Sequence, residues 1–304
     1  MSQRPVDLPS ASFEIDLGPG RTAVQAFDAD GQAPCLMLVP ALGVPARHYH
    51  RLGAALAGEG VNAMVLDLRG VGSSSLRARR GVDWGYLDLV DAELNILFRL
   101  AGERWPGQAR HWLGHSLGGQ LCLLHQARHP EHRAGSVVLA ASGAPWVRTF
   151  APPMRWLVGL FAWLVAASTR RLGVFRGDWF RFGGPQGARL MLEWARFCRT
   201  GRLNGLGKEG WDACPELARL ELPILGLSMA GDTYAPQAST ERLAAMTAAP
   251  FRLERVDRVD GHRPGHFRWL RHPAEPARRI AAFLNERGTA PKHLEGARGS
   301  ARRA

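Results

Sequence analysis

Ser116 lies at the centre of a Gly-x-Ser-x-Gly pentapeptide, Gly114-His115-Ser116-Leu117-Gly118. This spacing is typical of a nucleophile elbow, a tight turn that presents a serine hydroxyl between a strand and a helix. The turn strains the serine backbone, and a side chain at either flanking glycine would collide with the neighbouring elements. Residues 109–113 can form the strand, and the apolar spacing over 117–128 is helical. The pattern predicts that Ser116 is a nucleophile, and the alternative is a serine that caps a helix.

A serine nucleophile needs a histidine to take its proton and a carboxylate to orient that histidine. In proteins with this elbow, the acid and then the histidine follow the serine along the chain. Asp232 comes directly after 222–229, an apolar run of strand length, so its carboxylate can face the serine loop. We therefore predict that Asp232 is the acid, with an Asx turn or a helix cap as its alternative role. Asp257 and Asp260 come too late, beside the histidine itself.

Two nearby histidines compete for the role of base. His266 stands in a Pro-Gly-His-Phe sequence, and His262 precedes it by four residues. A strand is predicted over 251–256 and a helix over 274–284, which places His266 in the loop before the last helix. We predict that His266 is the base and that His262 is a solvated loop residue.

Four motifs in this order resemble the α/β-hydrolase superfamily over residues 13–285. They are the elbow, the loop Asp67-Leu-Arg-Gly-Val-Gly-Ser73, the pair Gly231-Asp232, and Gly265-His266-Phe267. Within the superfamily, the chain is most similar to uncharacterised bacterial predicted hydrolases of the serine aminopeptidase and monoacylglycerol lipase branch. The resemblance implies that a Ser-His-Asp triad lies at the strand ends of a parallel sheet.

The chain departs from many superfamily members in the loop where they carry His-Gly. Here the sequence is Val39-Pro40-Ala41-Leu42-Gly43. An oxyanion hole needs a backbone N–H rather than a particular side chain, so Leu42 and Leu117 are the predicted donors. Pro40 has no N–H, and a register shifted by one residue would make Ala41 the donor instead of Leu42.

Patterns of strand length and helix length alternate along the 304 residues, which predicts an α/β fold with a doubly wound, mostly parallel sheet. In such a sheet the loop 67–73 is expected to be structural, with Asp67 and Arg69 bracing neighbouring loops. The predicted core consists of residues 13–142 and 216–287. A helical lid is predicted over 143–215 and a disordered basic tail over 288–304.

The segment between the predicted strands 136–139 and 224–228 is longer than a crossover helix needs, so it is predicted to be the lid. More than half of the ten tryptophans lie in it: Trp146, Trp156, Trp163, Trp179, Trp194 and Trp211. We predict an apolar acyl pocket, with Trp146 and Trp163 as candidate lining residues. The alternative is that these rings only pack the lid helices onto the core.

The most apolar part of the predicted lid is 156–167, which has Arg155 before it and Arg170 and Arg171 after it. This run is shorter than the roughly 20 residues that cross a bilayer. It is predicted to be a helix buried against the core, with a helix that lies on a lipid surface as the alternative.

The formal net charge of +12 suggests attraction to an anionic lipid or substrate. A nucleic-acid partner is not expected, because the arginines are spread over many segments without a nucleic-acid-binding motif. No apolar signal segment follows Met1, which predicts a cytoplasmic protein. Neither a cofactor nor a metal is expected, since the cysteines show no metal or redox spacing and are predicted to be reduced, buried thiols: Cys35, Cys122, Cys198 and Cys214.

These features together predict a serine hydrolase that cleaves a carboxylic ester of a small or medium apolar acyl group through an acyl-enzyme on Ser116. The same triad would serve an acyltransferase, an amidase or an aminopeptidase, and the sequence does not separate these activities. A non-catalytic binding protein on the same fold is the least supported alternative, because all three triad positions are filled.

Overall fold

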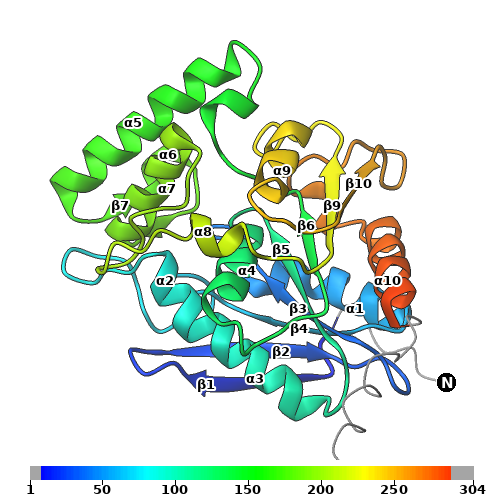
Figure 1. Ribbon diagram of the computed structural model, residues 1–304. Coiled ribbons are helices and arrows are strands. Elements are labelled where there is room, and N and C mark those ends of the chain that lie inside the picture. The colour runs from blue at the N-terminus through cyan, green and yellow to red at the C-terminus, as the bar shows by residue number, and fades with distance from the viewer. Residues whose placement is uncertain (1–7, 289–304) are drawn as a thin grey trace, which may run out of the picture.

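The computed structural model of this chain describes residues 8–288 (Figure 1). Eight strands form one sheet in the order β1-β2-β4-β3-β5-β6-β9-β10. Neighbours pair in parallel from β4 to β10, whereas β2 is antiparallel to both β1 and β4. The strands are β1 (Ala11–Asp16), β2 (Arg21–Phe27), β3 (Cys35–Val39), β4 (Asn62–Leu66), β5 (Arg110–His115), β6 (Val137–Ala140), β9 (Ile224–Met229) and β10 (Phe251–Val256). This mostly parallel sheet confirms the predicted fold class.

The central strands are apolar on both faces because helices cover both sides of the sheet. In β3, Met37 belongs to one buried cluster, and its neighbours Leu36 and Leu38 belong to the other, as the two-residue period of a strand requires. The first cluster includes Leu121 and its neighbours in α4 (Leu117–Arg128), and the second includes Leu52 of α1 (His50–Gly58).

Two helices cover one face of the sheet, and the remaining core helices cover the other face (Figure 1). The first pair is α1 (His50–Gly58) and α10 (Ala274–Gly288). The second group is α2 (Tyr86–Asp88), the π-helical turn η2 (Leu89–Leu94), α3 (Asn95–Arg104), α4 (Leu117–Arg128) and α9 (Gln237–Ala244). Short 3₁₀ turns are η1 (Ala46–Tyr49) and η4 (Arg268–Leu270).

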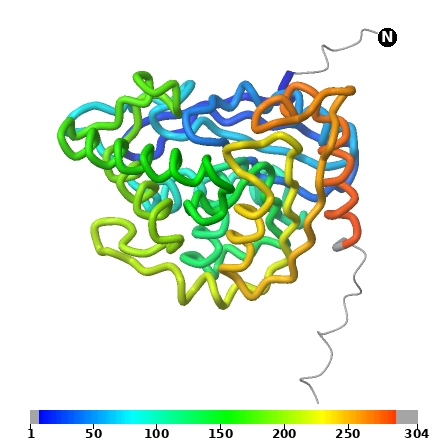
Figure 2. The backbone as a smooth tube through the Cα atoms, turned by 90° about the horizontal axis from the view of Figure 1, so that it is seen from above, coloured from blue at the N-terminus to red at the C-terminus, as the bar shows by residue number. Residues whose placement is uncertain are grey.

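The segment between β6 and β9 is mostly helical and begins beyond the carboxyl ends of the central strands (Figures 1 and 2). Its later residues, among them Leu190, Phe197 and Leu217, belong to the main buried cluster of the core. The segment contains η3 (Val147–Thr149), α5 (Met154–Leu172), the hairpin of β7 (Phe175–Arg176) and β8 (Pro185–Gln186), α6 (Gly177–Phe180), α7 (Ala188–Thr200) and α8 (Cys214–Leu217). We call this segment the insertion. Its two long helices, α5 and α7, pack against each other.

The prediction that 156–167 is buried against the core is wrong for most of its surface. In α5 only Ala162, Val165, Ala166 and Thr169 are buried. Trp156 and Trp163 are 70% and 60% exposed. The run is apolar around its whole circumference, so its sequence could not indicate which side would be covered. Among the helices of residues 8–288, none combines the length and apolar character needed to cross a bilayer.

The loop after β4 is held by buried polar contacts, which confirms the predicted bracing role of Asp67 and Arg69. Asp67 accepts hydrogen bonds from the backbone N–H groups of Ala46 and Ser73 at 2.6 and 2.8 Å. The Arg69 guanidinium pairs with the buried Glu93 carboxylate at 2.6 Å.

The four cysteines are free thiols, as predicted. Cys35, Cys122 and Cys198 are buried, whereas Cys214 is half-buried. Burial raises the pKa of the Cys35 thiol to about 12, so this group stays protonated. The predicted tail, apart from Gly288, lies outside the described residues.

Candidate active site

Ser116 sits at the junction of β5 and α4, with φ 54° and ψ −116°. A left-handed φ is costly for a non-glycine residue, and such strain is typical of a functional turn. An added Cβ at Gly114 would overlap the backbone of Gly119, and one at Gly118 would overlap the carbonyl of Val39. The serine side chain makes no capping hydrogen bond to α4, so the alternative role as a helix cap is not observed.

Asp232 and His266 come from two different strand ends and meet through a buried hydrogen bond. His266 Nδ1 lies 2.8 Å from Asp232 Oδ2, and the two side chains are 5% and 0% exposed. The other carboxylate oxygen, Oδ1, accepts hydrogen bonds from the N–H groups of Tyr234 and Ala235 at 2.8 and 2.9 Å. The carboxylate is therefore fixed by its own loop and in turn fixes the imidazole of His266.

His262 and the later aspartates lie apart from this pair. His262 is exposed in a turn where it exchanges backbone hydrogen bonds with Val259. Asp260 contacts His272, and Asp257 contacts Arg255. Of the histidines weighed from the sequence, the structure brings His266 to the Ser116 cavity and leaves His262 outside it.

The loop after β3 contributes Ala41 and Leu42 to the lining of the Ser116 cavity. The N–H of Ala41 donates to Tyr49 Oη at 2.8 Å, so this N–H is already used inside the protein. Leu42 and Leu117 both line the cavity that contains Ser116. Of the two registers left open by the sequence, the structure therefore favours Leu42.

A buried chain of hydrogen bonds connects this loop to the histidine loop, and sequence reasoning missed it. His115 Nε2 lies 3.0 Å from the carbonyl oxygen of His266, so Nε2 must carry the proton that is donated. Tyr49 Oη lies 2.8 Å from His115 Nδ1 and donates to it. Burial, together with nearby His266, holds the pKa of His115 well below its ordinary value, so the ring stays neutral. The sequence signal that could have revealed this chain is the position of His115 inside the elbow motif.

The cavity at Ser116 has a volume of about 120 Å³ and is lined in part by residues of the insertion. Arg181, Phe182 and Trp194 contribute from the insertion, and Tyr234 and Phe267 flank His266 from the core. A second, more apolar hollow of about 320 Å³ adjoins it and shares Arg181, Phe182, Trp194 and Tyr234 with it. We call this second hollow the acyl groove, after the function proposed for it below.

Neither tryptophan predicted from the sequence lines these hollows. Trp163 is 60% exposed on α5, and Trp146 packs beside Gly201 with the Arg242 guanidinium over its ring. Trp194 of α7 is the tryptophan that lines both hollows. Which tryptophan lines the hollows depends on which side of each insertion helix faces the core.

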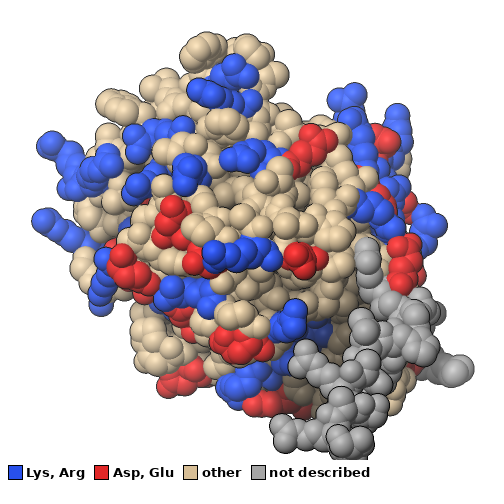
Figure 3. Space-filling view, in the orientation of Figure 1, with Lys and Arg blue, Asp and Glu red and all other residues tan. Residues whose placement is uncertain are grey.

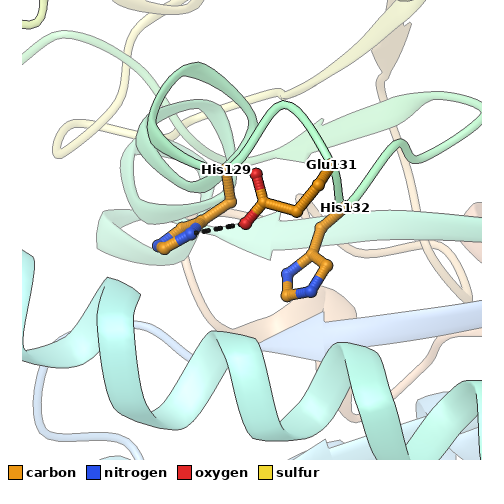
Figure 4. A group of neighbouring side chains, drawn as sticks. All are labelled: His129, Glu131 and His132. Atoms are coloured by element: carbon orange, nitrogen blue, oxygen red, sulfur yellow. Dashed lines mark hydrogen bonds and ion pairs between the residues drawn. The ribbon is translucent and has the colours of Figure 1, made fainter.

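A second group of titratable side chains, His129, Glu131 and His132, follows the C-terminal end of α4, whereas Ser116 precedes its N-terminal end (Figure 4). His129 contacts the carboxylates of Asp91 and Glu131 at 2.8 and 3.2 Å. Glu131 and His132 border a wide hollow of about 850 Å³ that contains none of the residues around Ser116. The contact between His129 and Asp91 identifies this group as a link between the end of α4 and η2.

Solved structures with the same fold have low sequence identity to this chain. A hydrolase from Pseudomonas aeruginosa is 20% identical, with a TM-score of 0.58, over 90% of this chain and 98% of its own. A monoacylglycerol lipase from Paleococcus ferrophilus is 16% identical, with a TM-score of 0.57, over 88% and 99%. Est1E from Butyrivibrio proteoclasticus, solved with ferulic acid, is 12% identical, with a TM-score of 0.61, over 91% and 100%. At these identities the likeness establishes the fold.

No curated protein matches the chain. The family described as serine aminopeptidase, S33, matches residues 32–253, which include the elbow and Asp232. This match covers most of the chain and agrees with the strand order and the elbow described above. The chain belongs to the serine aminopeptidase S33 family of α/β hydrolases and is an α/β-hydrolase enzyme.

Proposed function

We propose that this protein hydrolyses carboxylic esters of apolar acyl groups through a triad of Ser116, His266 and Asp232. The observation that carries the proposal is that Ser116, on its strained turn, shares one cavity with a histidine that is anchored by a buried carboxylate. The monoacylglycerol lipase among the structural relatives also supports ester chemistry on this fold.

In the proposed mechanism, His266 Nε2 takes the proton of Ser116 Oγ while Oγ attacks the ester carbonyl. The negative charge moves to the carbonyl oxygen, which the N–H groups of Leu42 and Leu117 stabilise. The imidazolium returns the proton to the leaving alcohol as the C–O bond breaks, which leaves an acyl-enzyme. Water then attacks with His266 as base, and the acid and free Ser116 are released. Asp232 keeps Nδ1 protonated throughout.

The lining of the cavity favours an apolar acyl ester over a peptide substrate. An aminopeptidase must hold an α-ammonium group, which calls for a carboxylate near the scissile bond. The described residues that line the cavity include no acidic side chain, and Arg181 is among them. Phe182 and Trp194 instead give the cavity and the acyl groove apolar walls.

We further propose that residues 143–215 form a helical lid over a core made of 13–142 and 216–287. The lid would set the length of acyl chain that reaches Ser116. Its support is that insertion residues line part of the Ser116 cavity.

A fluorophosphonate probe tests the nucleophile directly. The wild-type protein should be labelled once, and Ser116→Ala should be unlabelled and lose at least about 10³-fold in ester turnover. Ser168→Ala is the control, because Ser168 lies on α5 and lines neither hollow. Labelling that survives Ser116→Ala would refute the assignment of the nucleophile.

The same protein should then be offered p-nitrophenyl esters, aminoacyl p-nitroanilides, and esters with added glycerol as an acyl acceptor. We expect esters to be the best substrates and hydrolysis to dominate. Faster cleavage of the anilides would move the assignment to an aminopeptidase, and turnover that rises with glycerol would move it to an acyltransferase.

A further inference from the structure

We propose that the outer face of α5 docks onto an anionic lipid bilayer and that the acyl groove carries a lipid acyl chain from the bilayer to Ser116. The substrate class would then be a membrane-resident lipid ester. The docking stands on α5 alone, whereas the delivery of a substrate rests on the proposed function.

Three stripes run along α5, each at helical spacing. The first, Ala162, Val165, Ala166 and Thr169, is buried against the rest of the insertion. The second lines the acyl groove: Met154, Leu157, Val158 and Phe161. The third, Trp156, Leu160, Trp163 and Leu164, faces outward. A helix that is apolar on every side and buried on only one of them requires another apolar surface.

The outward stripe exposes large apolar side chains to an unusual extent. Trp156, Leu160, Trp163 and Leu164 are 70%, 56%, 60% and 38% exposed, and Leu157 beside them is 56% exposed. Large exposed apolar patches mark interaction sites on soluble proteins. Tryptophan and leucine on one side of a helix are the residues that enter the interface between lipid headgroups and acyl chains.

Basic residues lie at both ends of α5. Arg155 lies in the first turn of α5, Arg170 and Arg171 lie in the last turn, and Arg148 lies just before the helix. No acidic residue occurs between Met154 and Leu172. Within residues 8–286, these four arginines form no ion pair with a carboxylate. Figure 3 shows blue side chains beside a tan, uncharged surface at the upper left, where Figure 1 places α5.

This charge pattern selects a lipid surface as the partner. Each arginine or lysine near an anionic bilayer adds to the attraction, and apolar side chains then enter the interface. A second copy of this chain would bring the same arginines face to face and would repel. Viewed from above, α5 lies on the outer surface of the insertion, where a flat partner can reach it (Figure 2).

The groove continues from this surface to the serine. Leu157 is exposed at the outer stripe and also lines the acyl groove. The groove shares Phe182, Trp194 and Tyr234 with the cavity that contains Ser116 and His266. An acyl chain that leaves the bilayer beside α5 would stay against apolar walls until its ester reaches Ser116. Arg181 stands where the two hollows meet.

Cosedimentation with vesicles tests the docking without catalysis. The full-length Ser116→Ala protein is mixed with vesicles of phosphatidylcholine alone or with 30% phosphatidylglycerol, at low and high NaCl. We expect binding to the anionic vesicles at least tenfold tighter than to the neutral ones, with most of this difference lost at high salt. Failure to bind either vesicle would overturn the proposal.

Two variants in the same background localise the contact. Trp156→Gln with Leu160→Gln should weaken binding to anionic vesicles at least tenfold, and Arg170→Glu with Arg171→Glu should weaken it severalfold. Leu8→Gln is the control, because Leu8 is 65% exposed and precedes β1, which lies on the opposite side of the molecule (Figure 1). Unchanged binding of the Trp156/Leu160 variant would overturn docking through α5. If the protein binds no vesicle but forms a dimer in sedimentation, and if this variant abolishes the dimer, the partner of α5 would be a second copy of this chain instead of a lipid.

Activity separates the two proposals. In the Ser116-intact protein, Trp156→Gln with Leu160→Gln should leave turnover of soluble p-nitrophenyl acetate unchanged and lower hydrolysis of a long-chain ester embedded in anionic vesicles at least fivefold. Equal loss on both substrates would overturn the delivery route. Vesicle binding without turnover of any ester would reject the proposed function and leave the docking intact.

Discussion

At the scale of single residues, the candidate site brings together three side chains that are far apart in the sequence. Ser116 follows β5, Asp232 follows β9 and His266 follows β10. Parallel strands bring their carboxyl ends to one edge of the sheet, so these loops converge. The imidazole reaches the cavity in a fixed orientation because Asp232 is itself held by two backbone N–H groups.

Replacing each candidate histidine separates their roles. His266→Ala should lower kcat/KM for p-nitrophenyl butyrate by about 10³-fold or more, because no other base is found among the described residues that line the cavity. His262→Ala should retain most of the wild-type rate, since His262 is exposed in a turn. Steady-state kinetics on folded proteins, verified by circular dichroism, make the comparison. A larger loss in His262→Ala would transfer the role of base to His262.

Tyr49 links the loop after β3 to His115 through its buried hydroxyl. Tyr49→Phe keeps the ring but leaves the N–H of Ala41 and Nδ1 of His115 without their buried partner. We expect the free energy of unfolding to fall by about 1–3 kcal/mol and kcat to fall roughly tenfold, which corresponds to about 1.4 kcal/mol in the barrier.

Thr22→Val is the matched control for Tyr49→Phe. It removes a buried hydrogen bond to the carbonyl of Asp67, away from the cavity, so it should lower stability without changing kcat. Urea denaturation and steady-state kinetics would be measured for both variants. Equal kcat values would show that Tyr49 only stabilises the fold.

At the scale of elements, Glu193 joins α7 to the start of α2 and to the loop at Gly207. Its carboxylate accepts hydrogen bonds from the N–H groups of Tyr86 at the start of α2 and of Gly207 at 2.8 Å each. Burial raises the pKa of Glu193 from 4.5 to about 7. The attachment of α7, which carries Trp194, therefore responds to pH near neutrality.

The sign of this response follows from proton linkage. Because the native state binds the Glu193 proton more tightly than the unfolded chain, the free energy of unfolding falls as the pH rises from about 4.5 to about 7. Glu193→Gln does not titrate, so between pH 5 and pH 8 the wild-type protein should lose up to about 3 kcal/mol relative to this variant. Urea denaturation at each pH measures the difference. Glu241→Gln, at an exposed position on α9, should follow the wild type, and parallel curves for Glu193→Gln would contradict the expectation.

At the scale of the whole molecule, the insertion and the core share the lining of the site. Neither part alone encloses Ser116, because Phe182 and Trp194 come from one side and Tyr234 and Phe267 from the other. Selection of the acyl group is therefore expected to depend on how the insertion packs on the core.

The length of the acyl chain tests this packing. Burial of one methylene group contributes about 0.8 kcal/mol, so kcat/KM on p-nitrophenyl esters should rise from acetyl to medium chains and then level off. Trp194→Ala should flatten the rise, because Trp194 lines both hollows. Trp179→Ala is the control, since Trp179 is 61% exposed and lines neither. A profile that falls steadily from acetate would contradict an apolar groove.

The sequence by itself determined the local elements and the order of the candidate residues. Elbow spacing, strand lengths and helix periodicity act over a few residues, so α4 is found at 117–128 and β10 at 251–256, where they were predicted. The order of serine, acid and histidine then singled out Ser116, Asp232 and His266 from many polar residues.

Only the tertiary structure decided which neighbours these residues meet. Leu42 rather than Ala41 is left as a donor because Tyr49 takes the N–H of Ala41. Trp194 rather than Trp163 reaches the site because α7 turns that side inward. In α5, apolar residues on every side gave no preferred direction, so packing against α7 and against Phe175 of β7 selected the buried stripe and left the other apolar side exposed.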